Sequence, residues 1–298
     1  MKAIFWIKKL IKLICVPSGI IYNIISKRNK GIKILMYHRV KDDVQMELSV
    51  NTKDFQWQME YLKRKGYKVI SMDEACERIK NKNLEDKLVV LTFDDGYEDY
   101  YHHAYPILEK YGYPSMVYLV PSYIERKKVF WWDEALGESP LLSWQQIKEL
   151  QDKGLTSFGS HTWSHTNLRE TDIKTIRQEL TQSKNYIEDK LNIPVKHFAY
   201  PGGYNNGLSQ KLVKGIYTSG TCICDGISTY KASLSGDLSK IARVPVQKSD
   251  GKVLFAARLR GWIWFEKAVC RYKKLKNNKK VRKYSSIKSG ESRCVVNE

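Results

Sequence analysis

Residues 88–96 read Leu-Val-Val-Leu-Thr-Phe-Asp-Asp-Gly, an apolar run followed at once by two adjacent carboxylates. The apolar run has the length and composition of a buried strand, which would end where Asp94 and Asp95 begin. Two carboxylates side by side in a half-buried site repel each other, and the pKa of one of them rises unless a cation takes up the charge. The stretch therefore predicts a buried strand with a cation at its carboxyl end.

Similar apolar runs alternate with helical patterns along the chain. Strand-like runs cover residues 32–36, 69–70, 115–120, 155–159, 197–200, 217–223 and 242–246, and helical patterns cover residues 52–65, 72–80, 97–111, 143–153 and 172–191. This order predicts repeated βα units around a parallel sheet. The expected fold is therefore α/β, a distorted (β/α) barrel of about seven strands whose active site lies at the carboxyl ends of the strands.

Two histidines supply candidate partners for the aspartates. Three residues separate His161 from His165, so one tight turn can direct both imidazoles at a single point. One Asp with two His forms a plausible zinc site. Taken alone, the Asp pair could instead cap the helix that begins near Tyr97, and the histidines could be surface residues on a turn.

Four motifs resemble those of a known family, in the family's order. Leu-Thr-Phe-Asp-Asp-Gly from Leu91, Gly-Ser-His-Thr-Trp-Ser-His from Gly159 and Phe-Ala-Tyr-Pro-Gly-Gly from Phe198 resemble successive motifs of the polysaccharide deacetylase family, the NodB homology domain. Leu-Met-Tyr-His-Arg-Val from Leu35 resembles the opening motif of members whose catalytic histidine lies near the amino end. The similarity covers approximately residues 33–247.

The resemblance implies a metal-dependent hydrolase that removes N-acetyl groups from an amino-sugar glycan or a lipid-linked saccharide. By resemblance, Asp95, His161 and His165 bind a divalent metal, for which zinc is favoured, and Asp94 is the general base. Physical chemistry agrees, because three protein ligands leave a position open for water, whose proton a neighbouring carboxylate can accept. His38 is the expected proton donor to the leaving amine, since no histidine follows His197. Without the resemblance, His38 reads as a core histidine.

The third motif departs from the family pattern. Ala199 stands where many members have an arginine that orients the catalytic aspartate, and Gly202 stands where tyrosine is common. The backbone N–H of Gly202 could still donate to an oxyanion, because that contact needs no side chain. We hypothesise that Arg243, on the last predicted strand, reaches Asp94 in place of the missing arginine.

Aromatic residues are candidate sugar-binding surfaces, with core packing as the alternative for each. The candidates are Trp131, Trp132, Trp144, Trp163 and Tyr204. Two other functions stay open: a metal-dependent esterase that removes O-acetyl groups, and a non-catalytic glycan-binding protein at a membrane. The intact Asp and His sets argue against the non-catalytic alternative.

The net charge of +19 is concentrated at the two ends of the chain. Residues 1–33 carry eight Lys or Arg and no acid, and residues 267–298 carry eleven against two acids. We therefore divide the chain into a basic, apolar membrane-interacting segment (1–31), a deacetylase domain (32–250) and an amphipathic helix with a polybasic tail (251–298). Nucleic acid is not an expected partner, since no recognition motif accompanies the charge.

These ends predict peripheral attachment to an anionic membrane surface. The uncharged run 13–26 is too short to span a bilayer, and lysines interrupt the stretch that a signal peptide would need. Lysines are expected to face the headgroups, and the residues expected to face lipid are Ile4, Phe5, Trp6, Ile7, Leu10, Ile11 and Ile14. For the C-terminal segment, a solvated tail after a core helix is the alternative. The six cysteines lack disulfide-framework spacing, which favours a reducing compartment and the cytoplasmic face.

Overall fold

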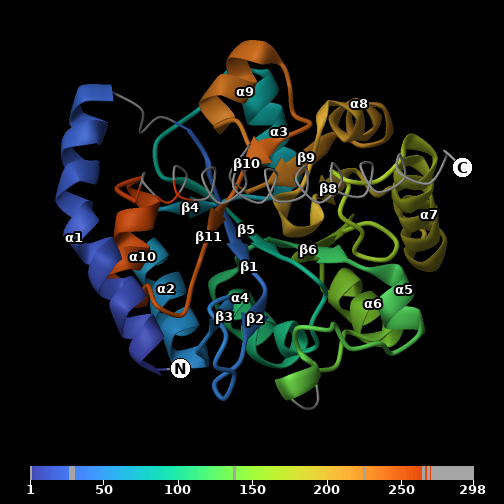
Figure 1. The fold of residues 1–298 in the computed structure, drawn as a ribbon, viewed down its shortest axis with the longest axis horizontal. Coiled ribbons are helices and arrows are strands. Elements are labelled where there is room, and N and C mark those ends of the chain that lie inside the picture. Colours follow the sequence, from blue (N-terminus) through green and yellow to red (C-terminus); the bar gives the residue numbers. More distant parts are fainter. Residues whose placement is uncertain are drawn as a thin grey trace, which may run out of the picture.

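The computed structural model describes residues 2–26, 31–136, 139–223 and 226–263, together with residues 266 and 269. Within these residues the core is one parallel sheet of nine strands, in the order β10-β9-β8-β7-β6-β5-β1-β11, with β4 paired to the start of β5. The sheet curves into a nearly closed barrel with helices around it (Figure 1). The predicted α/β class and distorted (β/α) barrel are confirmed.

The observed strands lie close to the predicted ones. The main sheet consists of β1 Lys33–Tyr37, β4 Lys68–Val69, β5 Leu88–Phe93, β6 Ser115–Leu119, β7 Thr156–Ser160, β8 His197–Ala199, β9 Ser219–Cys222, β10 Ile241–Ala242 and β11 Val244–Pro245. A separate small sheet pairs β2 (Arg39–Val40) with β3 (Ser49–Val50). The run predicted over residues 242–246 is divided at Arg243, because β10 pairs with β9 whereas β11 pairs with β1.

Helices connect the strands and surround the barrel. They are α1 Lys2–Ser26, α2 Thr52–Arg64, α3 Met72–Lys80, α4 Tyr105–Tyr111, α5 Pro121–Glu125, α6 Trp144–Asp152, α7 Ile173–Leu191, α8 Gly207–Ile216, α9 Thr229–Ser235 and α10 Gly251–Leu259. The helix predicted over residues 97–111 starts instead as a π-helical turn, η1 (Tyr100–Ala104), before α4. In that turn the buried Tyr100 hydroxyl hydrogen-bonds with Ser115 at 2.7 Å and Thr156 at 2.6 Å, which fixes it against β6 and β7.

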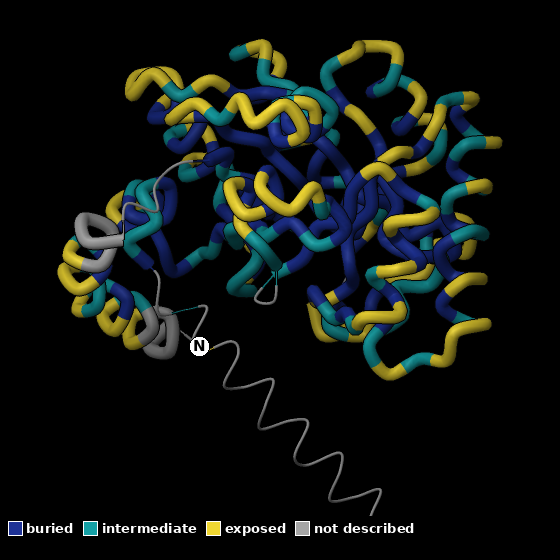
Figure 2. The backbone as a smooth tube through the Cα atoms, turned by 90° about the horizontal axis from the view of Figure 1, so that it is seen from above, coloured by how far each residue is buried: buried dark blue, intermediate teal, exposed yellow. Residues whose placement is uncertain are grey.

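β5 shows why a continuous apolar run forms a central strand. Val89, Leu91 and Phe93 join a hydrophobic cluster with α2, α4, α6 and α7, whereas Leu88 and Val90 join a second cluster with α3. Both faces of the strand are therefore buried, as Figure 2 shows for the interior of the barrel. The chain leaves this buried environment at Asp94, which places the aspartate pair at the carboxyl edge of the barrel.

Both predicted end segments have parts that pack on the barrel. Leu254, Phe255 and Leu259 of α10 are buried, so the core-helix alternative describes this part of the chain. Lys12 of α1 does not face headgroups as predicted, because it is buried among acceptors from the loop after β11. The polybasic tail, and the side chains of Ile4 and Phe5, lie outside the described residues. No helix in the described ranges has both the length and the apolar character needed to cross a membrane.

Candidate active site

The aspartate that follows β5 is held by an arginine from the segment between β10 and β11. Both carboxylate oxygens of Asp94 accept hydrogen bonds from the terminal nitrogens of Arg243, at 2.5 and 2.6 Å. The same guanidinium donates to the Thr92 hydroxyl at 3.3 Å. The structure thus brings Arg243, which lies between β10 and β11, to the carboxylate that the arginine missing at Ala199 would orient.

Charge pairing keeps Asp94 and Arg243 ionised although both are buried. Burial by itself raises the pKa of Asp94, but the positive charge of Arg243 and its hydrogen bonds outweigh this effect, and the pKa lies below its usual value. The same pairing raises the pKa of Arg243 against the effect of burial. A bidentate pair of this kind fixes orientation as well as charge. Asp94 therefore presents an ionised carboxylate in one fixed orientation.

The neighbouring Asp95 forms a compact cluster with the two histidines. Asp95 Oδ1 lies 3.6 Å from His161 Nε2 and 3.4 Å from His165 Nε2, and the three candidate ligand atoms all lie within 4.8 Å of one another. Among the described residues, Asp95 Oδ1 is buried and has no hydrogen bond of normal geometry. Leaving a buried carboxylate oxygen without a donor is costly, and a cation would remove that cost.

The spacing of these atoms fits a divalent metal. Ligands at about 2.0–2.1 Å from a tetrahedral zinc ion are about 3.3–3.5 Å apart, close to the separations around Asp95 Oδ1. Burial lowers the pKa of His161 to about 4, so its imidazole is neutral at pH 7, as a metal ligand must be. His161 Nδ1 lies 2.7 Å from the carbonyl oxygen of Ala199. Donation from Nδ1 to this oxygen leaves the Nε2 lone pair free for a metal.

Unusual backbone conformations and a carboxylate from α7 position the ligands. Asp95 and His165 have φ values of 72° and 58°, in the left-handed region that costs a non-glycine residue of order 1 kcal/mol. Glu179 accepts hydrogen bonds from the Ser164 N–H at 2.9 Å and from its hydroxyl at 2.6 Å. These bonds fasten the His161–His165 turn to α7, so the ligand geometry is fixed before any ion binds.

His38, at the end of β1, approaches both aspartates. Its Nε2 lies 4.0 Å from Asp94 Oδ2 and 4.0 Å from Asp95 Oδ2. The side chain is 17% exposed, so it borders the site and is not enclosed in the core. Nδ1 is buried and has no hydrogen-bond partner in the described part of the chain. The ring therefore borders the site with Nε2 directed toward the two aspartates.

An aromatic wall adjoins His165. The Trp132 ring stacks on Phe130 at 4.6 Å and lies 5.0 Å from the His165 ring. Its neighbour Trp131 is 74% exposed. The indole N–H of Trp132 donates to the Tyr97 hydroxyl at 3.0 Å, which in turn donates to Asp133 at 2.5 Å. Trp132 is therefore fixed beside the candidate metal ligands.

Two other aromatic candidates have structural contacts instead. Trp144 and Trp163 both pack against Tyr186 of α7, at ring distances of 5.8 and 5.2 Å. This arrangement agrees with the core-packing alternative for both residues. Trp163 links the His161–His165 turn to α7 through this contact.

The third motif forms a short 3-10 turn, η3 (Pro201–Gly203), with Gly202 in the left-handed region at φ 58°. A Cβ atom at Gly202 would lie 2.6 Å from the Tyr204 ring. Tyr204 therefore fills the space that a side chain at position 202 would need. The turn connects to the ligands through Ala199, whose carbonyl oxygen contacts His161.

The sequence did not predict the hydrogen bonds that hold β2 in place next to His38. The Asp99 carboxylate accepts hydrogen bonds from Arg39 Nε at 2.8 Å and from the Val40 N–H at 3.0 Å. Arg39 also donates to the Ser139 hydroxyl at 2.9 Å. No local pattern pairs residues this far apart in the chain, so the signal appears with the fold.

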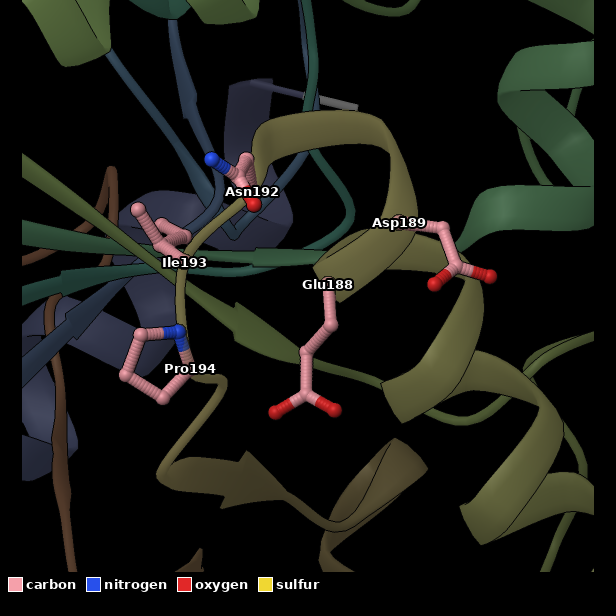
Figure 3. A pocket seen from close by; sticks show the side chains of 5 residues that line it. All are labelled: Glu188, Asp189, Asn192, Ile193 and Pro194. Carbon is pink, nitrogen blue, oxygen red and sulfur yellow. The ribbon is translucent and has the colours of Figure 1, made fainter.

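A surface hollow of about 530 Å³ lies at the C-terminal end of α7 (Figure 3). Its lining residues are Glu188, Asp189, Asn192, Ile193 and Pro194. They precede β8, at the amino edge of the sheet, whereas the aspartates follow the carboxyl end of β5. The hollow is therefore at the opposite edge of the barrel from the candidate active site.

Known proteins that resemble this chain in sequence and fold are polysaccharide deacetylases. The family model described as Polysaccharide deacetylase matches residues 81–216. The Putative polysaccharide deacetylase YxkH of Bacillus subtilis is 28% identical over 228 residues, which are 76% of this chain and 74% of the relative. The Poly-beta-1,6-N-acetyl-D-glucosamine N-deacetylase of Escherichia coli is 27% identical over 63% of this chain, but the match spans 33% of that protein.

Solved structures agree with the sequence matches. The Streptococcus pyogenes deacetylase PplD, in complex with acetate, superposes with a TM-score of 0.65 and 27% identity, covering 77% of this chain and 98% of that chain. The resemblance to the polysaccharide deacetylase family and the enzyme class, both predicted from the four motifs, are confirmed.

Proposed function

We propose that the chain is a metal-dependent N-deacetylase that hydrolyses the acetamido groups of an amino-sugar glycan. The observation that carries the proposal is Asp95 Oδ1, a buried oxygen that accepts no hydrogen bond of normal geometry from the described residues and faces two imidazole nitrogens at 3.4 and 3.6 Å. One Asp and two His favour zinc or a similar divalent ion. When bound, such an ion would supply Lewis-acid chemistry, lowering the pKa of water to about 7 and polarising the acetyl carbonyl.

Asp94 is the proposed general base. It lies beside the ligand set rather than in it, with Asp94 Oδ2 4.0 Å from His161 Nε2. Arg243 fixes both carboxylate oxygens and keeps the group ionised. Asp94 can therefore accept a proton from water as that water attacks the acetyl carbonyl.

His38 is the proposed general acid. An amide anion is too basic to leave, so breakdown of the tetrahedral intermediate needs a proton on the departing nitrogen. His38 Nε2 is 4.0 Å from an oxygen of each aspartate, and this proximity supports its assignment as the proton donor. The backbone N–H of Gly202 is the proposed donor to the oxyanion.

The substrate class follows from the wall beside His165 and from the relatives. The flat face of Trp132 and the 74% exposed Trp131 suit sugar rings, and Tyr204 is a further candidate contact. The Escherichia coli and Staphylococcus aureus relatives are named Poly-beta-1,6-N-acetyl-D-glucosamine N-deacetylases. We therefore propose a polymer or oligomer of N-acetylated hexosamine as the substrate.

Acetate release from two matched substrates tests this function. The purified, zinc-loaded protein is incubated with a β-1,6-linked N-acetylglucosamine oligomer and with an O-acetylated hexose oligomer. We expect acetate from the N-acetylated oligomer, with Asp94→Asn lowering kcat by about 10²–10⁴-fold while the metal content is retained. Asp152→Asn, at the exposed end of α6, is the matched control and should leave kcat unchanged.

Two outcomes would contradict the proposal. Acetate from the O-acetylated oligomer alone would make the protein an esterase. Sugar binding with a full metal complement, but without acetate from either oligomer, would make it a glycan-binding protein.

A further inference from the structure

α1 has a docked side and an apolar exposed side. Its exposed large hydrophobic residues are Trp6 at 69%, Ile7 at 59%, Leu10 at 59%, Ile11 at 52%, Ile14 at 69% and Ile21 at 59%. At about 100° per residue, these six positions fall within one sector of about 140°. We call them the α1 stripe. In Figure 2, where α1 is seen nearly end-on, the exposed residues lie on the side away from the barrel.

The opposite side of α1 is fastened to the barrel. Leu13 and Val16 pack in a cluster with Leu254 and Ala257 of α10. A Cβ atom at Gly19 would lie 1.7 Å from the carbonyl oxygen of Trp262, so helix and loop are in backbone contact there. The stripe is therefore held in a fixed orientation with respect to the barrel.

A buried lysine adds a polar anchor to this docking. Lys12 Nζ donates to Gln247 at 2.5 Å, Ser249 at 2.7 Å and Asp250 at 3.0 Å. Its charge is directed into the protein, so the stripe itself is left without it. Undocking α1 would remove this donor from all three acceptors, although Asp250 would keep Arg258 as its ion-pair partner, so the three hydrogen bonds favour one docked position.

Lys12 also relates α1 to the catalytic edge of the barrel. Residues 247–250 follow β11, which is parallel to β1, so they leave the sheet at the same edge as His38. The part of α1 around Lys12 therefore lies beside the loop that follows β11, and Figure 1 shows α1 alongside α10. Lys12 faces this loop, whereas the stripe lies on the opposite side of α1.

We propose that the α1 stripe docks the protein on an anionic lipid surface. An apolar face on a basic helix, with Trp6 at one end and Lys9 5.1 Å from its ring, is typical of an interfacial helix. Besides the buried Lys12, residues 1–33 carry seven basic residues and no acid, which complements anionic headgroups. Two copies meeting through this stripe would bring these like charges together, which disfavours a second copy as the occupant.

Vesicle flotation of the full chain tests the proposal independently of catalysis. The protein is mixed with phosphatidylcholine vesicles with and without about one third phosphatidylglycerol, at low and high salt. We expect flotation with the anionic vesicles, reduced by high salt because the electrostatic part is screened. Ile7→Gln with Ile14→Gln should lower the bound fraction by about tenfold or more, since polar groups then replace apolar ones at the lipid.

A matched variant separates the stripe from general surface hydrophobicity. Ile173→Gln with Leu234→Gln removes two exposed apolar residues, 49% and 63% exposed, from α7 and α9, and should float like the unmodified protein. Circular dichroism should show all variants equally folded, because every substituted side chain is exposed. Equal flotation of both variants, or no flotation of the unmodified protein, would overturn the proposal. A dimer that the Ile7 and Ile14 substitutions dissolve, without vesicle binding, would assign the stripe to a second copy and also overturn it.

Discussion

Arg243 shows how a position lost from one motif is compensated by another residue. The third motif has Ala199 where an arginine is common, yet Asp94 still has a bidentate guanidinium partner. Ala199 keeps a separate contact through its backbone, since its carbonyl oxygen orients His161. In this chain Arg243 supplies the charge beside Asp94, and Ala199 supplies the backbone acceptor beside His161.

Replacing Arg243 is predicted to lower turnover more than substrate binding. In Arg243→Ala, Asp94 loses both hydrogen bonds and its orientation, so we expect kcat to fall about 10–100-fold with KM little changed. Arg243→Lys should recover part of kcat, because lysine restores the charge but not the bidentate geometry. Steady-state kinetics with equal metal content measure this effect, and an unchanged kcat in the alanine variant would refute a positioning role.

The predictability of single residues depended on sequence distance. Asp94 and Asp95 could be assigned to a strand end because the buried run precedes them directly. His161 and His165 were recognisable as a pair because one turn joins them. The contact between Arg39 and Asp99, by contrast, forms across 60 residues and had no local signature. Which atoms bind a metal or substrate stays a prediction.

Secondary-structure elements were predictable where one hydrophobic period dominates. α3 has its predicted bounds because apolar residues recur at helical spacing after the Ser71 cap. α8 was missed because Gly207 and Gly215 weaken its helical pattern, although Asn206 and Ser209 form a reciprocal capping box. The π-helical turn η1 was missed because its cause is tertiary, the hydrogen bonds of the Tyr100 hydroxyl with two strands.

The link between α7 and the His161–His165 turn is predicted to set metal affinity. Glu179→Ala removes the acceptor of two hydrogen bonds from Ser164, so we expect metal affinity to fall about 10–100-fold. Glu179→Gln keeps one carbonyl acceptor and should lie between the alanine variant and the unmodified protein. Metal titration by competition with a chelating dye gives the affinities, and identical affinities in all three proteins would contradict the role of Glu179.

Two glycines have opposite predicted effects on stability, one where α1 docks on the barrel and one in α8. Gly19→Ala places a methyl group against the Trp262 backbone and should destabilise the protein by about 1–3 kcal/mol. Gly215→Ala, in α8, meets no atom within 4 Å and should stabilise by about 0.5–1 kcal/mol through helix propensity. Thermal unfolding compares them, and a neutral Gly19→Ala would mean that α1 does not pack on residue 262.

For the molecule as a whole, the sequence identified the barrel but not how its ends are arranged. The alternation of strands and helices reflects burial on both sheet faces, which sequence pattern records directly. The arrangement of α1 and α10 depends on one lysine turning inward, and charge composition alone favoured the opposite orientation. Lys12 is 6% exposed, and the acceptors of Gln247, Ser249 and Asp250 replace the water that its ammonium group loses on burial.

The hydrolytic role of the Asp95, His161 and His165 cluster is tested by measuring metal content and acetate release together in His161→Ala. His102→Ala is the control, because His102 is a half-exposed histidine on η1. We predict that His161→Ala loses bound metal and acetate release in parallel, whereas the control keeps both. Full acetate release from a His161→Ala protein without metal would contradict the account.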